Sequence, residues 1–381
     1  MLDVFNREVG GVHTPAFMLK IGNEDITSNL ASRLISLTLT DKRAFEADEL
    51  SIELDDADGQ VSLPARGTVI RIFLGWKGQP LVDKGSFIVS EVGHHGTPDV
   101  VSVRAQSADF RSSLNVRREE SWHDTSLSEI VNAIASRNKL TASVATTLAE
   151  IKIPHIDQSQ ESDAAFLTRL ADRNGASFTI KAGKILFIKA GRGTTASGQH
   201  IPLVTITRSE GDRHQFGIAD RNVYTGVTAK WLQTKNPKNQ QPLHVQRKPK
   251  ASSANIPSAG KSTSIDTKPK ANEVYTLGDP KNVFVLTTIY ADKAQAMRAA
   301  QVKWEQLQRW AAQFSLNLAV GRPELCPETP VKVIGFKRAI DELSWIINTV
   351  THSLSAGGYM TSIVLEENVM DVEYEITGAD S

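Results

Sequence analysis

Hydrophobic and polar residues alternate with a period of two along much of the first hundred residues. Four segments show this alternation: RLISLTLT (33–40), ELSIEL (49–54), TVIRIFLGW (68–76) and GSFIVSEV (85–92). Successive side chains of a strand point to opposite faces, so each segment is predicted to be a strand with one buried and one wet face. Short strands separated by Gly and Asp turns favour an antiparallel barrel or sandwich.

The middle of the chain changes to the period of a helix. Apolar residues recur at helical spacing over 124–140 and again over 162–175, and either Asp124 or Ser126 is a suitable N-cap for the first helix. Two strand-like segments joined by a Gly-containing turn follow within 177–190. This order predicts an α+β insert between two β-rich regions.

A second β-rich region begins near Ile201 and is interrupted by a basic stretch. Between residues 235 and 270 there are eight Lys or Arg residues and one acid, Asp266, so the local charge is 8 − 1 = +7. Such a segment cannot bury enough apolar surface to offset chain entropy, which predicts a disordered loop. Strands resume at 283–290. A long helix is predicted over 291–313, with an apolar stripe that packs on its own barrel.

Composition narrows the class of protein. The 381 residues include 43 Lys or Arg and 43 Asp or Glu, so the formal net charge is zero. A dedicated nucleic-acid binder usually carries a basic excess, whereas near-zero net charge favours association. The lone Cys326 excludes an intrachain disulfide, and we expect it to be an inert small residue. No segment has the character of a secretory signal or of a membrane span, so we expect synthesis in a cytosol-like compartment.

Several local patterns suggest metal or phosphate sites, and each lacks a required residue. The run 55–59, Asp-Asp-Ala-Asp-Gly, would place Leu54 and Ala65 at obligatory carboxylate positions of a calcium loop, so we interpret it as a turn. The triplet 260–262, Gly-Lys-Ser, has no leading glycine of a phosphate loop, and the run 191–193 lacks its third glycine. His94 and His95 would point to opposite faces of a strand, so we expect them in a loop at a hairpin end rather than on one metal.

Hydrolytic chemistry has equally little support. His155, Asp157 and Ser159 lie close in sequence, but no Gly-x-Ser-x-Gly elbow accompanies them. A carboxylate pair that cleaves peptidoglycan has no distinguishing mark among abundant Asp and Glu residues. The residues alone therefore predict no catalytic, cofactor-binding or metal-binding site, and indicate a multi-domain, β-rich, association-prone protein.

Longer phrases of the sequence are specific when they are read together. The phrases are DDADG (55–59), LGWKG (74–78), PDVVSVRAQSADFR (98–111), REESWHDTSLSEIV (118–131), KIPHIDQSQESDAAFLTRLADRNGA (152–176), GDRHQFGIADRNVYTGVTAKW (211–231), FSLNLAVGRPEL (314–325) and PVKVIGFKRAID (330–341). In order and spacing they resemble the late control D proteins of temperate contractile-tailed phages. The resemblance covers nearly the whole chain and is weakest at roughly 233–280.

The resemblance implies a baseplate hub related to the hub domains of type VI secretion spikes. It implies a homotrimer that joins a hexameric tail tube to a separate trimeric spike and also contacts other baseplate proteins and the tape measure protein. Genomic DNA would be met only in transit, and no cofactor is expected. The protein would be located in the virion tail, and in the host cytoplasm during assembly. Two less favoured functions are a hub with peptidoglycan hydrolase activity and a nucleic-acid-binding late-gene regulator.

Pattern and resemblance together predict an α+β, β-rich fold with two similar tail-tube-like antiparallel barrels. The expected domains are a first barrel (1–107), an α+β middle domain (108–200), a second barrel (201–232 with 283–370), a flexible basic loop (233–282) and a C-terminal tail (371–381).

Overall fold

The computed structural model describes most of the chain between residues 14 and 378. The described residues are 14–43, 47–107, 112–181, 183–189, 191, 193, 195, 199–218, 224, 226–232, 240–247, 282–290, 293–309, 312–368 and 374–378. They form a mostly β fold with a smaller share of helix, as predicted. The chain divides into a larger unit (Met1–Asp172, Ala176–Gly217 and Ala312–Asn368) and a smaller unit (Arg173–Gly175, Ile218–Ala311 and Val369–Ser381).

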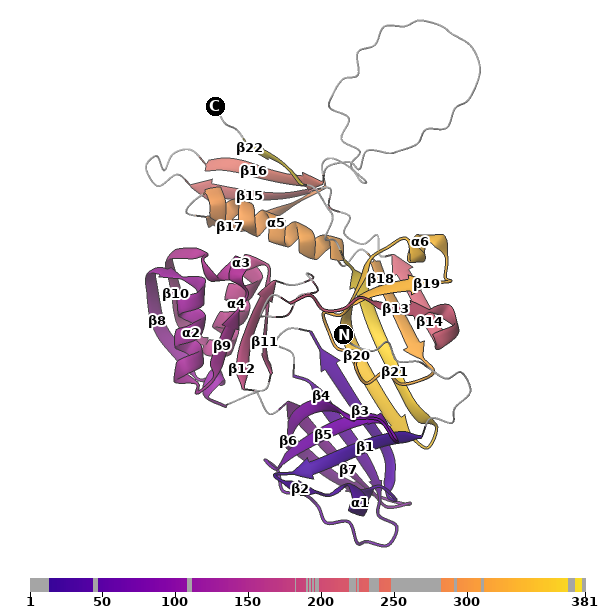
Figure 1. The fold of residues 1–381 in the computed structure, drawn as a ribbon. Coiled ribbons are helices and arrows are strands. Elements are labelled where there is room, and N and C mark those ends of the chain that lie inside the picture. Colours follow the sequence, from indigo (N-terminus) through magenta and orange to yellow (C-terminus); the bar gives the residue numbers. More distant parts are fainter. Residues whose placement is uncertain are drawn as a thin grey trace, which may run out of the picture. The chain divides into compact units, whose positions relative to one another are not determined.

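One thirteen-stranded sheet dominates the larger unit (Figure 1). Its strands are β1 (Pro15–Ile21), β2 (Glu24–Asp25), β3 (Leu34–Lys42), β4 (Glu49–Asp55), β5 (Val69–Trp76), β6 (Val82–His95), β7 (Val100–Ser107), β13 (Val204–Thr207), β14 (Gly211–Ile218), β18 (Ala312–Leu318), β19 (Pro330–Ile334), β20 (Trp345–Ser355) and β21 (Gly358–Glu367). Short helices lie between them: α1 (Thr27–Leu30), η2 (Arg208–Glu210) and α6 (Arg338–Asp341). The main path runs β14-β18-β21-β20-β3-β4-β7-β6-β5-β1-β2, with β19 beside β20 and β13 beside β19.

The N-terminal and C-terminal halves of this sheet have the same strand order. The first half runs β3-β4-β7-β6-β5-β1, and the second runs β14-β18-β21-β20-β19-β13. When the six strands of each half are numbered in chain order, both halves give the same spatial order, 2-3-6-5-4-1. One pairing differs in direction, because β13 is parallel to β19 whereas β1 is antiparallel to β5. The halves are therefore alike in strand order, although neither is a closed barrel.

A bulge at the same place strengthens the correspondence. The register of β6 with β7 shifts between Val89 and Glu91, and that of β20 with β21 shifts between Ile347 and Thr349. One extra residue bends a strand locally at such a point. When the two bulges are aligned, His94 of β6 becomes the counterpart of His352 of β20.

Strands β3 and β20 join the two halves into one sheet. They pair antiparallel from Lys42 opposite Thr349 to Ser36 opposite Ser355, just beyond the bulge of β20. The prediction of two separate barrels is therefore wrong, since the C-terminal strands continue the N-terminal sheet. Alternation along a strand reveals which face is buried, but it does not reveal which other strand occupies each edge.

Two apolar cores lie against the buried face of this sheet. In the first half, Leu37, Leu39 and Leu50 belong to a core built from β1 and β3–β7. In the second half, Phe314 and Trp345 lie in a core built mainly from β13 and β18–β21. The first core also contains Leu354 of β20 and Tyr359 of β21, so buried residues of the second half contribute to it.

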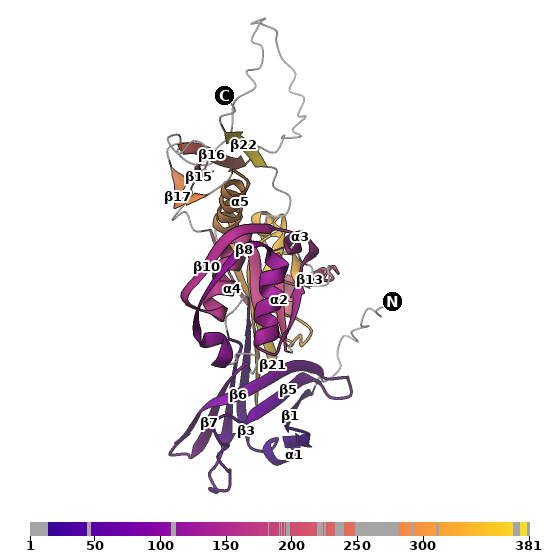
Figure 2. The same cartoon turned by 90° about the vertical axis from the view of Figure 1, so that its left-hand side faces the viewer.

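The middle region packs two helices against a small sheet. Its elements are η1 (Ser112–Asn115), β8 (Arg117–Ser126), α2 (Leu127–Arg137), β9 (Thr141–Val144), α3 (Thr146–Ala149), β10 (Lys152–Ser162), α4 (Asp163–Asn174), β11 (Ala176–Lys181) and β12 (Lys184–Lys189). Strands β11, β12 and β9 form one sheet, and β8 and β10 form a curved ribbon beside the helices (Figure 2).

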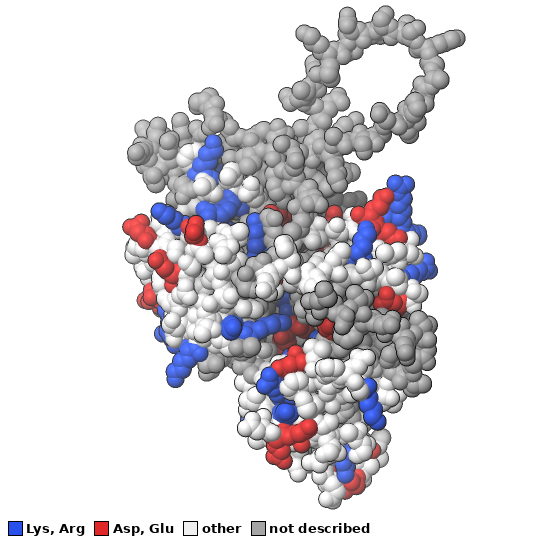
Figure 3. All heavy atoms as spheres, viewed as in Figure 1, with Lys and Arg blue, Asp and Glu red and all other residues white. Residues whose placement is uncertain are grey.

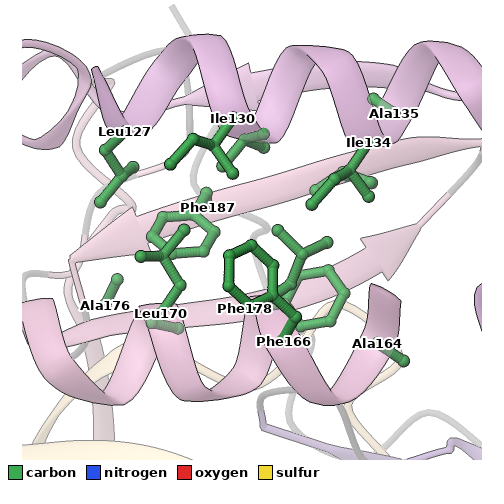
Figure 4. Close-up of a cluster of buried hydrophobic side chains, with 14 of the residues drawn as sticks. Leu127, Ile130, Ile134, Ala135, Ala164, Phe166, Leu170, Ala176, Phe178 and Phe187 are labelled. Carbon is green, nitrogen blue, oxygen red and sulfur yellow. The ribbon is translucent and has the colours of Figure 1, made fainter. Parts of the chain in front are cut away.

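The core of this region confirms the helical periodicity seen in the sequence. Leu127, Ile130 and Ile134 of α2 and Leu170 of α4 point toward Phe178 and neighbouring rings between them (Figure 4). Ser126 is the N-cap of α2, and its side chain forms a capping box with Glu129.

The smaller unit is a four-stranded sheet with one long helix. The strand order is β17 (Val283–Tyr290), β15 (Gly226–Leu232), β16 (Gln240–Arg247) and β22 (Tyr374–Gly378). Ala296, Ala300 and Trp304 of helix α5 (Lys293–Arg309) share a buried core with Val227 and Ala229 of β15.

This unit corrects three expectations. β15, β17 and α5 belong to it and not to the sheet of β18–β21, so the second barrel over 201–232 and 283–370 is wrong. Residues 240–247 of the predicted basic loop form a strand, and residues 374–378 of the predicted tail form its partner. Neither segment has a strong apolar pattern, and backbone pairing with β15 and with each other gives them strand structure. The rest of the basic loop lies outside the described residues.

Candidate functional site

The outer face of the sheet at the β3–β20 junction carries small uncharged side chains. Thr40 lies opposite Thr351 and Thr38 opposite Ser353, and the hydroxyl oxygens of Thr40 and Thr351 are 3.5 Å apart. The side chains of β3, β20 and β21 that alternate with the buried residues are Ser36, Thr38, Thr40, Thr349, Thr351, Ser353, Ser355, Met360, Ser362 and Val364. Short uncharged side chains therefore line the centre of this face, and Lys42 of β3, which lies opposite Thr349 and pairs with Glu49, marks its end.

A buried cluster of charges fixes the end of β3. The Arg43 guanidinium lies 2.7 Å from a carboxylate oxygen of Glu328 and 2.6 Å from one of Glu366, and the three side chains are only 12%, 8% and 5% exposed. Arg43 also donates to the Ile347 carbonyl, and Glu328 accepts from the Gly191 backbone N–H at 2.9 Å. An unpaired buried charge destabilises the folded state, because it has lost its hydration without gaining a counter-charge. Each of these three buried charges therefore depends on its partners for stability.

A second cluster ties the middle region to the sheet. Lys181 at the end of β11 has its Nζ 2.7 Å from a carboxylate oxygen of Asp41 and 3.8 Å from one of Asp48. Burial and the neighbouring Asp41 charge raise the pKa of Asp48 to about 7, against the opposing effect of Lys181. Burial lowers the pKa of Lys181, but the two carboxylates outweigh it and raise the pKa overall. Lys181 is thus held by Asp41 and Asp48, and the raised pKa leaves the Asp48 carboxyl partly protonated near neutral pH.

Polar contacts also connect the first half to the loop that follows β18. Trp76 donates its indole N–H to the Gly321 carbonyl at 3.1 Å and packs against Tyr359, with ring centroids 5.3 Å apart. Lys84 donates to the Leu325 carbonyl at 3.1 Å. The Tyr359 hydroxyl lies 2.9 Å from Nδ1 of fully buried His352. Burial, followed by the Lys84 charge, holds the pKa of His352 well below its usual value, so this imidazole is neutral.

The β8–β10 ribbon brings together two histidines that the sequence separates. His123 and His155 are cross-strand partners with Nδ1 atoms 3.1 Å apart and stacked rings. Nε2 of His155 lies 3.2 Å from Asp157, which also accepts from Ser121 at 2.7 Å. Sequence reasoning missed His123 and Ser121, because only the pairing of the strands makes them neighbours.

The geometry of this cluster does not favour acyl transfer or glycoside hydrolysis. Ser121 donates to the carboxylate and not to a histidine, and Ser159 lines an open groove that Asp157 also borders. The hydrogen bond from Ser121 is the main cause that lowers the pKa of Asp157. A general acid in a hydrolase needs a raised pKa, so Asp157 lacks the property expected of that role.

The remaining candidates from the sequence have structural roles. In the run 55–59, Asp56 accepts from the Val61 N–H at 2.8 Å, and Gly59 has a φ of 67°, so the segment is a turn as predicted. His94 and His95 end strand β6, so the expectation of a loop there is wrong. The sulfur of half-buried Cys326 lies 3.4 Å from the Thr329 hydroxyl. Arg192 and the triplet 260–262 lie outside the described residues.

The described surface has a mixed character. On the face drawn in Figure 3, basic and acidic side chains are interspersed among a larger uncharged area. Among the described residues, no His, Cys, Asp and Glu side chains gather in groups of three or more suited to a metal ion. No helix within the described part of the chain is long and apolar enough to cross a membrane.

Comparison with known proteins identifies the family. Residues 32–358 match the family model described as phage tail baseplate hub (GPD). The chain is 58% identical over 381 residues to the probable baseplate hub protein of Escherichia phage 186, and 59% identical over 388 residues to that of Escherichia phage P2. These alignments cover 98% of this chain in both cases, and 98% and 99% of the two relatives.

This chain belongs to the phage tail baseplate hub family.

Solved structures agree with the hub fold. A 43 kDa tail protein of prophage MuSo2 from Shewanella oneidensis has a TM-score of 0.61 at 14% identity, covering 92% of this chain and 97% of that one. An E. coli component of the type VI secretion system, c3393, has a TM-score of 0.52 at 12% identity, covering 92% of this chain and 77% of that one. At such low identity these likenesses show the fold alone.

Membership of the hub family confirms the resemblance found in the sequence. The relatives are named for a structural role in the tail baseplate, so the chain is a structural protein of the virion tail and not an enzyme. The regulator hypothesis depended on the basic stretch 235–270, of which the structure describes only residues 240–247.

Proposed function

We propose that this hub is a homotrimeric adaptor that joins a hexameric tail tube to a separate trimeric spike. The main support is the repeated strand order within one sheet, β3-β4-β7-β6-β5-β1 and β14-β18-β21-β20-β19-β13. Each chain thereby offers two similar bodies, so three chains offer 2 × 3 = 6 similar positions around an axis. Repetition of a fold is a simple way to match a sixfold tube to a threefold spike.

The buried contacts between the halves suit a part that carries load. The Arg43 cluster and the Trp76–Tyr359 contact connect segments more than 240 residues apart in sequence. A joint made of packed rings and paired charges resists bending, because close-packed interiors deform little. The two halves would then keep a fixed angle when the tail contracts.

The outer face of β3, β20 and β21 suits the wall of a passage for DNA. Its Ser and Thr side chains are short and uncharged. Clustered Lys or Arg side chains on such a wall would bind phosphates and retard ejection. In this proposal the face lines the lumen of the ring, genomic DNA is met only in transit, and the tape measure protein is met during assembly in the host cytoplasm.

The copy number of a purified complex tests the adaptor function. The hub is produced together with its spike protein, and the complex is weighed by native mass spectrometry. Three hub chains per complex are expected. Two or six chains would contradict the proposal. The spike is included because such interfaces can require the partner to form.

A further inference from the structure

The contact between β3 and β20 has an unused counterpart elsewhere in the chain. In the shared strand order, β3 of the first half corresponds to β14 of the second, and β20 corresponds to β6. Within the chain, β3 pairs with the part of β20 that comes after the bulge of β20. The equivalent contact would place a β14 strand on the edge of β6 that follows its own bulge.

That edge of β6 is open among the described residues. β5 pairs with β6 only as far as Val69 opposite Ile88, and no described strand continues along this edge from Glu91 to His95. The counterparts in β20 are covered by β3. As a result, the His94 side chain is 46% exposed, whereas the corresponding His352 is fully buried.

The outer edge of β14 is also unpaired within the described sheet. β14 ends the strand path and has β18 as its neighbour on one side. Ile218 at its end is 65% exposed. Open edges with exposed apolar side chains are aggregation-prone unless another strand covers them.

We propose that β14 of one hub pairs with the open edge of β6 in the next copy, as β3 pairs with β20 within one chain. This inference rests on the proposed homotrimer and names its interface. Contacts within and between chains then alternate around the ring. Since the contact joins two different surfaces, it repeats head to tail and closes when six similar bodies complete a turn.

The internal contact also predicts the register. With the bulges aligned, Leu365 of β21 corresponds to Ala105 of β7, so its partner Phe314 corresponds to Leu50, the partner of Ala105. Leu39 lies opposite Leu50.

The rings of His214 and Phe216 both lie edge-on to Phe314. The Ser315 hydroxyl donates to the Gln215 carbonyl at 3.4 Å, which places Gln215 beside Ser315, and we therefore take Phe216 as the partner of Phe314 and the counterpart of Leu39. Within the chain, His352 lies opposite Leu39 and Ser353 opposite Thr38. The interface should therefore place His94 opposite Phe216 and His95 opposite Gln215.

Paired cysteines test this register. The variant His95→Cys with Gln215→Cys, made in a Cys326→Ser background, is oxidised within the hub–spike complex. Directly opposite residues of antiparallel strands are about 4.5–5.5 Å apart at Cα, which lies within disulfide range. The matched control is Thr38→Cys with Ser353→Cys in the same background, because the structure pairs those residues within one chain.

The expected result is a disulfide-linked set of three chains for the first variant, and an internal disulfide that leaves single chains for the control. A labelling experiment adds an independent readout. The single variant His95→Cys in the same background should react with a maleimide in the free chain and become protected in the complex.

Two outcomes would overturn the inference, and they are distinguishable. In the first, the complex has three hub chains and the control pair closes, but the thiols introduced by His95→Cys and Gln215→Cys stay reduced and reactive. This outcome would refute the β6–β14 contact and leave the adaptor function standing. In the second, the complex does not have three hub chains, which would refute both.

Discussion

At the scale of single residues, the joint between the sheet halves depends on charges that are buried together. Arg43 holds two carboxylates whose side chains are almost fully enclosed. In contrast, the ion pair of Arg338 with Glu342 lies on the surface, with 89% and 62% of the two side chains exposed. The two arrangements have similar distances, and their energies differ because solvent screens only the second.

Removal of the Arg43 side chain should therefore be strongly destabilising. Arg43→Ala leaves Glu328 and Glu366 as unpaired buried charges, and we expect a loss of about 3–5 kcal/mol in the free energy of unfolding. Arg338→Ala, the control, should cost less than about 1 kcal/mol. Urea unfolding of the two variants measures the difference. Equal losses in the free energy of unfolding would show that the buried cluster stabilises the fold no more than the surface ion pair does.

The raised pKa of Asp48 predicts a pH dependence with a definite sign. The folded pKa is about 7 and the unfolded value is near 3.8, so the folded state binds more protons between these values. Stability from this group is present at low pH and is lost as pH rises toward 7, with a slope of at most about 1.4 kcal/mol per pH unit.

Asp48→Asn isolates this effect, because the amide can still accept from the Lys42 N–H. The stability of the native hub, relative to that of the variant, should fall between pH 5 and pH 7 and then level off. Urea titrations at several pH values give the comparison. A relative stability that rises over the same range would contradict the assignment.

At the scale of elements, the local cap of helix α2 contributes to stability separately from the long-range pairing of strands. Helix α2 begins at a complete capping box, in which the Ser126 hydroxyl accepts from the Glu129 N–H and the Glu129 carboxylate accepts from the Ser126 N–H. These two bonds satisfy backbone donors that a helix leaves free at its first turn.

Ser126→Ala should cost about 1 kcal/mol of stability, since the cap is lost while the buried face of α2 is unchanged. Ser136→Ala, at an exposed position within the same helix, is the control and should be neutral or slightly stabilising because alanine has the higher helix propensity. Thermal unfolding of both variants tests the prediction. A cost at Ser136 as large as that at Ser126 would refute the role of the cap.

At the scale of the whole molecule, the two units should respond differently to truncation. The basic stretch was predicted to be a disordered loop, but residues 240–247 form β16, which pairs with both β15 and β22. Deletion of residues 238–270 removes this strand from the four-stranded sheet and leaves the thirteen-stranded sheet intact.

We expect the deletion to lower the melting temperature of the smaller unit and to leave the main transition of the larger unit nearly unchanged. Differential scanning calorimetry, with tryptophan fluorescence as a second probe, can separate the two. An unchanged thermogram would mean that β16 adds no stability, and a collapse of both transitions would mean that the units fold as one.

Much of the local structure was predictable from the sequence alone. Alternation identified the buried faces of β3 and β4, and helical spacing located α2, because both depend on side chains near one another along the chain. The sequence offered Asp124 or Ser126 as the N-cap of α2, and the structure has Ser126 there. The family was predictable from phrases spread over the chain, and its match covers residues 32–358. The turn at 55–59 was predictable because Asp and Gly have local conformational preferences.

Only the tertiary structure decided which strands share edges and which distant side chains meet. The backbone hydrogen bonds that join β3 to β20 are the same for any sequence, so no local pattern marks this pairing. Arg43 meets Glu366 across 323 residues, and His123 meets His155 across 32, as consequences of strand registers set by packing elsewhere. For the same reason, β16 has strand structure without an apolar pattern of its own. Periodicity specifies the faces of elements, and the choice of partner belongs to the folded chain as a whole.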